Sequence, residues 1–139
     1  MKTTIKSFVA ASIVLALTAV LLSFYTIQQQ AQGKAWDIPG KYKAMKNPSP
    51  GKDVEVGKAL WAKHCKSCHG AAGLGDGAKS KMLKTNPGNF SEAKFQANSD
   101  GAMYYMAFVG RDEMPNFEKK IVDESDRWAL INFIRTLKK

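Results

Sequence analysis

Residues 64–69 read His-Cys-Lys-Ser-Cys-His and hold both cysteines and both histidines of the 139-residue chain. With only two cysteines, the chain cannot be a small scaffold held together by several disulfides. The chain also carries 21 basic and 12 acidic residues, for a formal net charge of +9. Such a charge is compatible with nucleic acid, anionic lipid or acidic proteins and does not choose among them. The chemistry of the chain is therefore expected to lie in this one hexapeptide.

The hexapeptide contains Cys-x-x-Cys-His, which is the attachment motif of c-type haem. Cys65 and Cys68 would form thioethers with the haem vinyl groups, and His69 would be the proximal iron ligand. A zinc site is disfavoured because tetrahedral sites usually draw their ligands from two separated segments. A thioredoxin-like dithiol would need a βαβ context that the flanks lack, and a plain disulfide is the remaining alternative. The motif predicts one covalent haem c, with His64 facing solvent or packing locally.

An apolar segment precedes this motif. Residues 8–27 contain no charged side chain, and a helix of their length rises about 30 Å, the thickness of a hydrocarbon core. They are predicted to form a transmembrane anchor, and a cleaved secretory signal is the alternative. Lys2 and Lys6 mark residues 1–7 as cytoplasmic by the positive-inside rule. The expected location is the inner membrane, single-pass, with the rest of the chain on the periplasmic side, or the periplasm after cleavage.

Residues 28–52 are interrupted by glycines and prolines and are predicted to be a linker. Trp36 and Tyr42 within this linker could dock on the following domain or lie at the membrane interface. Residues 53–139 are predicted to form the single folded domain. A domain of about this size buries only roughly two thirds of the surface that its unfolded chain exposes. A covalent cofactor would therefore help it to build a core.

From about Val54 to the C-terminus the sequence resembles the class I cytochrome c family. In that family a helix with a glycine and an aromatic residue leads into the haem motif, as Gly57 and Trp61 do here. The family's last helix crosses this first one, and here a helix is expected after Asp123, a good N-cap. The resemblance implies an all-α fold, with a small helical cytochrome c-like domain around one haem, preceded by the transmembrane or signal helix. The last helix carries an apolar stripe of Trp128, Ile131, Ile134 and Leu137.

The resemblance also implies the residues on the proximal side of the haem. The carbonyl of Pro87 is expected to accept the imidazole N–H of His69, which would fix the ring and strengthen it as a donor. Phe90 is expected to form a wall of the pocket. The glycine-rich residues 70–77 are similar to the loop that follows the haem motif in short cytochromes c. They are not expected to bind phosphate, because no hydrophobic strand precedes them and the Lys-Ser/Thr of a P-loop is missing.

Met114 is the expected sixth ligand of the iron. It precedes Pro115 in a loop, and the family's distal ligand is similarly a methionine followed by proline. The alternative is that Met114 only fills a gap, with a histidine or nothing at the sixth position. Other methionines are disfavoured by position: Met45 precedes the domain, Met82 is too near His69 in the chain, and Met103 and Met106 lie in a helix expected over residues 100–110, capped by Asp100 and ended by Gly110.

A haem with both axial positions filled exchanges single electrons, so the resemblance implies an electron carrier and not an enzyme. The expected partners are respiratory redox proteins with acidic docking patches, such as a quinol-oxidising complex and a terminal oxidase. The alternatives are a haem-based sensor, a peroxidase-like enzyme, or a fixed subunit of a larger oxidoreductase complex. Nucleic acid is not expected, since the domain is predicted to be exported. Steering toward acidic partners would rest on lysines that flank the motif: Lys63, Lys66, Lys79, Lys81 and Lys84.

Overall fold

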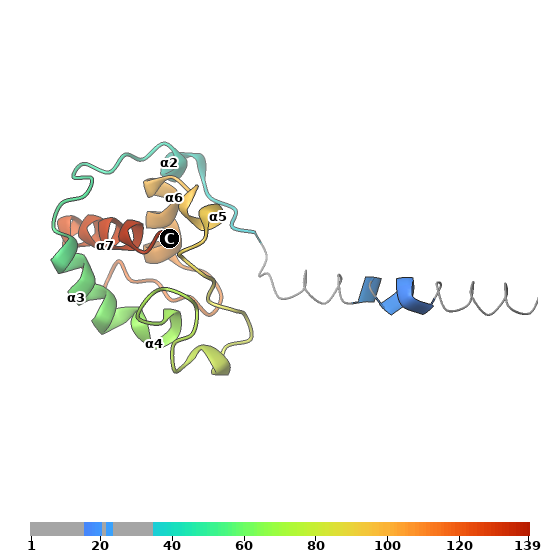
Figure 1. Ribbon diagram of the computed structural model, residues 1–139. Coiled ribbons are helices and arrows are strands. Elements are labelled where there is room, and N and C mark those ends of the chain that lie inside the picture. Colours follow the sequence, from blue (N-terminus) through green and yellow to red (C-terminus); the bar gives the residue numbers. More distant parts are fainter. Residues whose placement is uncertain (1–15, 21, 24–34) are drawn as a thin grey trace, which may run out of the picture. The chain divides into compact units, whose positions relative to one another are not determined.

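The computed structural model describes residues 16–20, 22–23 and 35–139 of the chain. The chain divides into two units, Met1–Gly33 and Lys34–Lys139 (Figure 1). In the first unit, the described residues 16–20 and 22–23 are helical. The second unit is called the helical unit below, and it contains the haem motif.

The predicted cytoplasmic residues 1–7 lie outside the described residues, as do most positions of the predicted span 8–27. Within the part of the chain that the structure describes, no helix combines the length and the apolar character that crossing a membrane requires. The transmembrane anchor therefore stays a prediction from the sequence.

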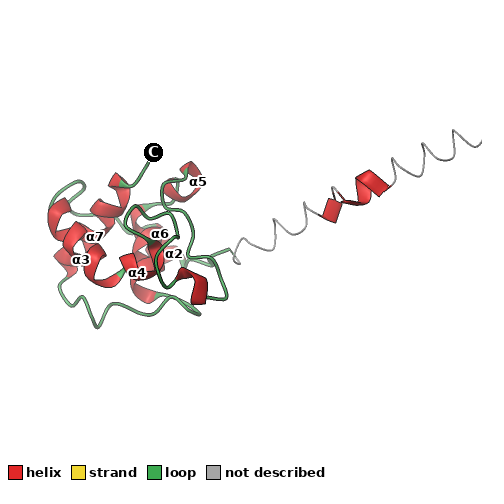
Figure 2. Cartoon of the chain, turned by 60° about the horizontal axis from the view of Figure 1, so that its bottom comes forward, coloured by secondary structure: helices red, strands yellow, loops and turns green. Residues whose placement is uncertain are grey.

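The predicted all-α class is confirmed for the helical unit (Figure 2). Between residues 35 and 139 there is no strand, only an isolated bridge between Arg111 and Met114. The helices are short, and loops account for much of the unit. In chain order the elements are α2 (Gly40–Lys43), α3 (Val54–His64), α4 (Lys66–His69), the 3-10 helix η1 (Ser80–Met82), α5 (Ala93–Gln96), α6 (Asp100–Tyr104), the π-helix η2 (Tyr105–Val109) and α7 (Glu124–Thr136).

The unit is built on the contact between α3 and α7, its two longest helices (Figure 1). A Cβ placed on Gly57 of α3 would lie 2.0 Å from the carbonyl oxygen of Ala129 on α7. Only glycine therefore allows the two backbones to come this close. Helix α7 begins where expected, since the Asp123 side chain accepts a hydrogen bond of 3.0 Å from the Ser125 N–H.

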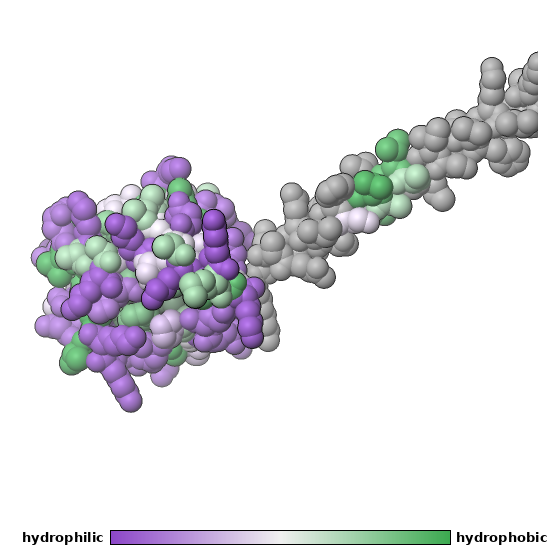
Figure 3. Space-filling view, turned by 90° about the horizontal axis from the view of Figure 1, so that it is seen from below, coloured by the Kyte–Doolittle hydropathy of each residue, from purple (hydrophilic) through white to green (hydrophobic). Residues whose placement is uncertain are grey.

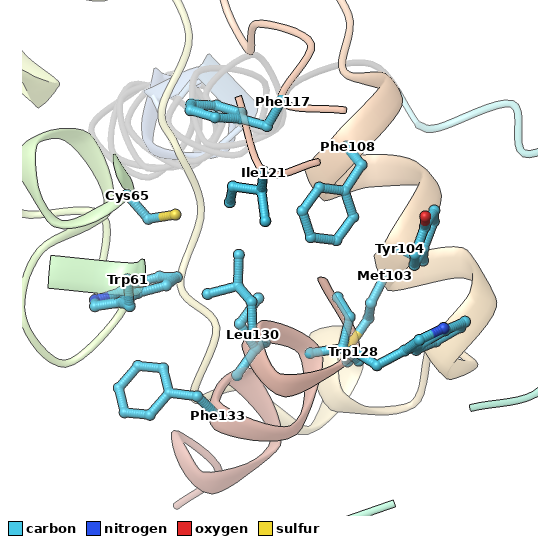
Figure 4. Close-up of a cluster of buried hydrophobic side chains, with 12 residues drawn as sticks. Trp61, Cys65, Met103, Tyr104, Phe108, Phe117, Ile121, Trp128, Leu130 and Phe133 are labelled. Carbon is cyan, nitrogen blue, oxygen red and sulfur yellow. The ribbon is translucent and has the colours of Figure 1, made fainter. Parts of the chain in front are cut away.

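The hydrophobic core lies between α7 and the elements α3, α6 and η2 (Figure 4). Phe108, Trp128 and Ile131 are at most 1% exposed. Figure 4 places Cys65 beside Trp61 at one side of this cluster, so the first cysteine of the motif borders the core. The motif is thus continuous with the packing that holds the helices together.

The helix expected over residues 100–110 is divided and begins differently. The α-helical part α6 gives way to the π-helix η2, and Gly110 ends it with φ of 72°. Its N-cap is Ser99, whose side chain accepts a hydrogen bond of 3.2 Å from the Ala102 N–H. Asp100, the expected cap, instead pairs with the Arg135 guanidinium of α7 at 2.6 Å. An ion pair with a second helix has drawn Asp100 away from capping.

Residues 35–52, which belong to the predicted linker 28–52, pack on the rest of the helical unit. Ile38 is 7% exposed. The ring centroid of Tyr42 lies 4.8 Å from that of Tyr105 on η2, and Trp36 contacts the same tyrosine edge-on at 6.2 Å. Of the two positions considered for Trp36 and Tyr42, the structure shows the one docked on the domain.

A buried amide on α7 extends this packing. Asn132 is 2% exposed and accepts a hydrogen bond of 2.8 Å from the Asn47 side chain. It donates to the carbonyls of Ser49 and Lys52 at 2.7 and 2.9 Å. A buried amide needs partners for all its polar atoms, and Asn132 finds these three in the expected linker. The folded unit therefore begins near Lys34 and not at residue 53.

Candidate functional site

The two cysteines and the histidine of the motif lie on a single helical turn. Cys65 ends α3 with a hydrogen bond of 2.9 Å from its N–H to the Trp61 carbonyl. The N–H of His69 then bonds back to the Cys65 carbonyl at 3.0 Å, which closes the turn α4. Both thiols are free. Burial, and to a lesser extent the neighbouring Cys68, raises the pKa of Cys65 to about 12, so this thiol is protonated at neutral pH.

The imidazole of His69 is buried and neutral. Burial lowers its pKa to about 4, while the carbonyl of Pro87 acts in the opposite direction. The neutral form is the one that binds a metal ion. The Nδ1 atom is buried without a hydrogen bond of regular geometry. Pro87 therefore lies near the ring, as the resemblance implies, but the expected hydrogen bond itself stays a prediction.

Aromatic rings surround the His69 imidazole. The ring centroid of Phe90 lies 4.6 Å from that of His69, and Phe90 in turn stacks on Phe95 at 4.1 Å. Trp61 lies 5.8 Å from His69, and its indole N–H donates to the Gly70 carbonyl at 3.0 Å. Phe90 therefore lies beside the imidazole, and its place in the wall of the haem pocket stays a prediction. The indole bond to Gly70 is a further fixing contact, which the sequence alone did not indicate.

The glycine-rich loop folds back onto α4. The N–H of Gly75, which has φ of 76°, donates to the His69 carbonyl at 2.9 Å. A Cβ on Gly77 would lie only 2.5 Å from the Ser67 carbonyl oxygen. These glycines are therefore needed for close approach of the loop to the motif.

Met114 lies in a tight loop that follows the motif at a distance along the chain. Its backbone exchanges two hydrogen bonds with Arg111, of 2.9 and 2.8 Å. Its side chain is partly buried and packs against the hydrophobic core. The neighbouring Glu113 carboxylate accepts bonds of 3.0 Å from the N–H groups of Lys84 and Thr85. These bonds hold the pKa of Glu113 below its usual range, and the bond from the Lys84 N–H has the largest effect.

The other methionines considered as iron ligands have different surroundings. Met82 is 80% exposed, whereas Met103 is 1% exposed within the core. Met45 and Met106 are partly buried and pack against the core. Met103 therefore packs in the core, as its position in the expected helix suggested, and Met114 stays the predicted sixth ligand.

His64 packs locally, one of the two positions expected for it. Its ring centroid lies 5.9 Å from that of Phe117. Burial, followed by the positive charges of Lys63 and Lys120, lowers its pKa. In the described part of the chain, no group of three or more His, Cys, Asp or Glu side chains is arranged to hold a metal ion.

The motif fits a covalently bound haem, because one turn presents two free sulfurs and a neutral, buried imidazole with an unsatisfied Nδ1. The family model described as Cytochrome c matches residues 54–138. This chain belongs to the cytochrome c family. Cytochrome c domains bind haem c through Cys-x-x-Cys-His, and Cys65, Cys68 and His69 fit a single haem. A comparison of the chain with curated proteins gives no match. The cytochrome c match supports a role in haem-based electron transfer.

Proposed function

We propose that this cytochrome c is a mono-haem, one-electron carrier in which His69 and Met114 would bind the iron. The observation that carries the proposal is the Met114 loop, which is fastened to the rest of the domain through the Arg111 side chain, which donates to the Ala35 carbonyl, and through Glu113. A methionine in a fastened loop, followed by Pro115, is suited to permanent ligation. A displaceable ligand would need a loop that opens easily.

When bound, the haem would supply one-electron redox chemistry at its iron. The residues of this chain hold the ring system in place and control its surroundings. His69 offers a neutral nitrogen, and its shielding by Trp61 and Phe90 keeps water away from the proximal side. The Met114 thioether is a soft ligand that favours the reduced iron and thereby raises the reduction potential. Electron exchange then requires little movement of the protein.

The optical spectrum of the purified protein tests this proposal. We expect a six-coordinate spectrum in the reduced protein, a far-red sulfur-to-iron band in the oxidised protein, and no rapid change on adding carbon monoxide at neutral pH. Rapid carbon monoxide binding and a missing far-red band would instead indicate a sensor or peroxidase-like protein with an open iron position.

The proposed setting is the periplasmic face of the inner membrane, with residues 8–27 as anchor and respiratory complexes as electron donor and acceptor. The uncharged apolar run of residues 8–27 and the two lysines before it support this setting. Detergent extraction followed by size measurement separates a free carrier from a fixed subunit. A particle of the size of one chain in its micelle is expected for a carrier, and a much larger particle would indicate a fixed subunit.

Lysines near the motif are proposed to steer the domain to acidic partners. Figure 3 views the side on which α4 and η1 lie in Figure 1, and hydrophilic residues surround hydrophobic patches there. A positive rim around an exposed haem edge would speed encounters with negative partners at low salt. The five exposed lysines are Lys63, Lys66, Lys79, Lys81 and Lys84.

Replacing Lys66 and Lys79 with glutamate is expected to slow oxidation by the anionic oxidant ferricyanide on the order of tenfold at low salt. The difference should vanish at high salt, because ions screen surface charges. Stopped-flow absorbance measures both rates. The matched control reverses two exposed lysines away from the motif, Lys43 and Lys52, and should change the rate much less. Equal slowing by both pairs would show an effect of net charge only.

A further inference from the structure

The first described residues of the helical unit contact the loop that carries Met114. We call residues 35–47 the strap. The guanidinium carbon of Arg111 lies 4.0 Å from the ring centroid of Trp36 in the strap, and its Nη1 donates to the Ala35 carbonyl at 2.8 Å. The same Arg111 exchanges both backbone hydrogen bonds with Met114. One residue thus joins the strap to the predicted distal ligand.

The strap is itself firmly placed. Trp36 meets the Tyr105 ring edge-on at 6.2 Å, and Tyr42 packs on the same ring at 4.8 Å. Ile38, between them in sequence, is buried. The surface that Arg111 contacts is therefore anchored on η2, and η2 belongs to the core through Phe108.

The Met114 loop has little freedom between its two fastenings. Gly110 has φ of 72°, and Asp112 has φ of 48°, so the chain turns sharply on both sides of Arg111. A Cβ on Gly110 would lie 2.3 Å from the Met114 carbonyl oxygen. In so tight a loop, a shift of Arg111 is transmitted directly to the Met114 backbone.

We propose that Trp36 and Arg111 are positioning residues for Met114, so that the strap holds the distal ligand in place. The inference rests on the proposed function, in which Met114 binds the iron. A guanidinium over a tryptophan face together with a hydrogen bond to a carbonyl fixes both the direction and the distance of the arginine. Releasing Arg111 removes one of the loop's attachments, and the bond from Met114 to the iron then competes less well with added ligands.

The test measures imidazole binding to the oxidised, haem-loaded full-length protein by its optical spectrum. Arg111→Gln is expected to raise imidazole affinity roughly tenfold, since a cation–π contact and one hydrogen bond together contribute about that factor. Trp36→Leu should raise it about threefold, because the bond to Ala35 survives. The double variant should match Arg111→Gln alone, since both changes remove the same contact. The far-red band should weaken in the same order.

Lys41→Gln is the matched control. Lys41 also lies in the strap and also has its cation over an aromatic ring, that of Tyr42 at 5.0 Å, but the contact does not involve the Met114 loop. It should leave imidazole affinity within twofold of the unmodified protein. Thermal unfolding is measured beside the titrations, because a purely structural role would lower the melting temperature without changing imidazole affinity.

Two outcomes separate the inference from the proposed function. If the unmodified protein has the far-red band and Arg111→Gln leaves imidazole affinity unchanged, the strap does not position Met114 and the inference alone fails. If the unmodified protein lacks the far-red band, Met114 is not the ligand, and the proposed function fails together with the inference.

Discussion

Substitution of Gly57 by alanine is expected to lower the free energy of unfolding by about 3 kcal/mol, the upper part of the range for overpacking. An alanine Cβ at this position would lie 2.0 Å from the Ala129 carbonyl oxygen and 2.9 Å from the Phe133 Cβ. Neither obstacle is the end of a flexible side chain, so α3 and α7 must move apart. Local helix preference acts in the opposite direction, because alanine favours a helix interior over glycine by about 1 kcal/mol, so the expected loss comes from the clash.

Denaturant unfolding of the haem-loaded protein, followed by circular dichroism, measures the effect. Gly40→Ala is the matched control, because a Cβ on Gly40, at the start of α2, has no atom within 4 Å. This control should change stability by less than about 0.5 kcal/mol. A Gly57→Ala protein as stable as the control would mean that α3 and α7 do not approach as closely as described.

Met114→Leu is expected to abolish the far-red sulfur-to-iron band and to let carbon monoxide bind rapidly to the reduced protein. Leucine has a similar volume but no sulfur, so the loop can keep its packing while the sixth position opens. The reduction potential should fall, because the soft thioether that favours the reduced iron is gone. Optical spectroscopy and a redox titration measure these effects on the same sample.

Met82→Leu is the control for this experiment. Met82 is 80% exposed, so this substitution makes the same chemical change at the surface. It should retain the far-red band, the potential and the resistance to carbon monoxide. A Met114→Leu protein that keeps the band would contradict the assignment of Met114 and would direct attention to Met45 and Met106, which are partly buried.

Local signals made some parts of this molecule predictable. The motif from Cys65 to His69 lies within a single turn, so its spacing alone fixes which side chains share a site. Helix α7 is predicted by the Asp123 cap and by an apolar stripe at helical spacing. Gly57 was notable only with the family resemblance in view, because a glycine inside a helix is otherwise merely unfavourable.

Long-range contacts account for what the sequence did not show. The predicted linker, residues 28–52, is interrupted by glycines and prolines. The packing of the strap within it depends on distant partners such as Asn132, which lies 85 positions from Asn47. Ser99 and Asp100 are both good caps, and the choice between them is made by Arg135 on another helix. The attachment of Glu113 to Lys84 and Thr85 likewise joins two loops with no pattern in common.

The hydrogen bonds of Asn132 have a practical consequence for anyone who prepares this domain alone. The family match begins at residue 54. A chain that began there would lack Ile38 and would expose the surface that Ile38 covers. The Asn132 amide would also lose its partners Asn47, Ser49 and Lys52. A buried amide without partners costs about 1–3 kcal/mol, a large share of the stability of a small domain. A shortened version of this cytochrome that keeps these contacts therefore starts no later than Ile38, well ahead of the residues that match the family.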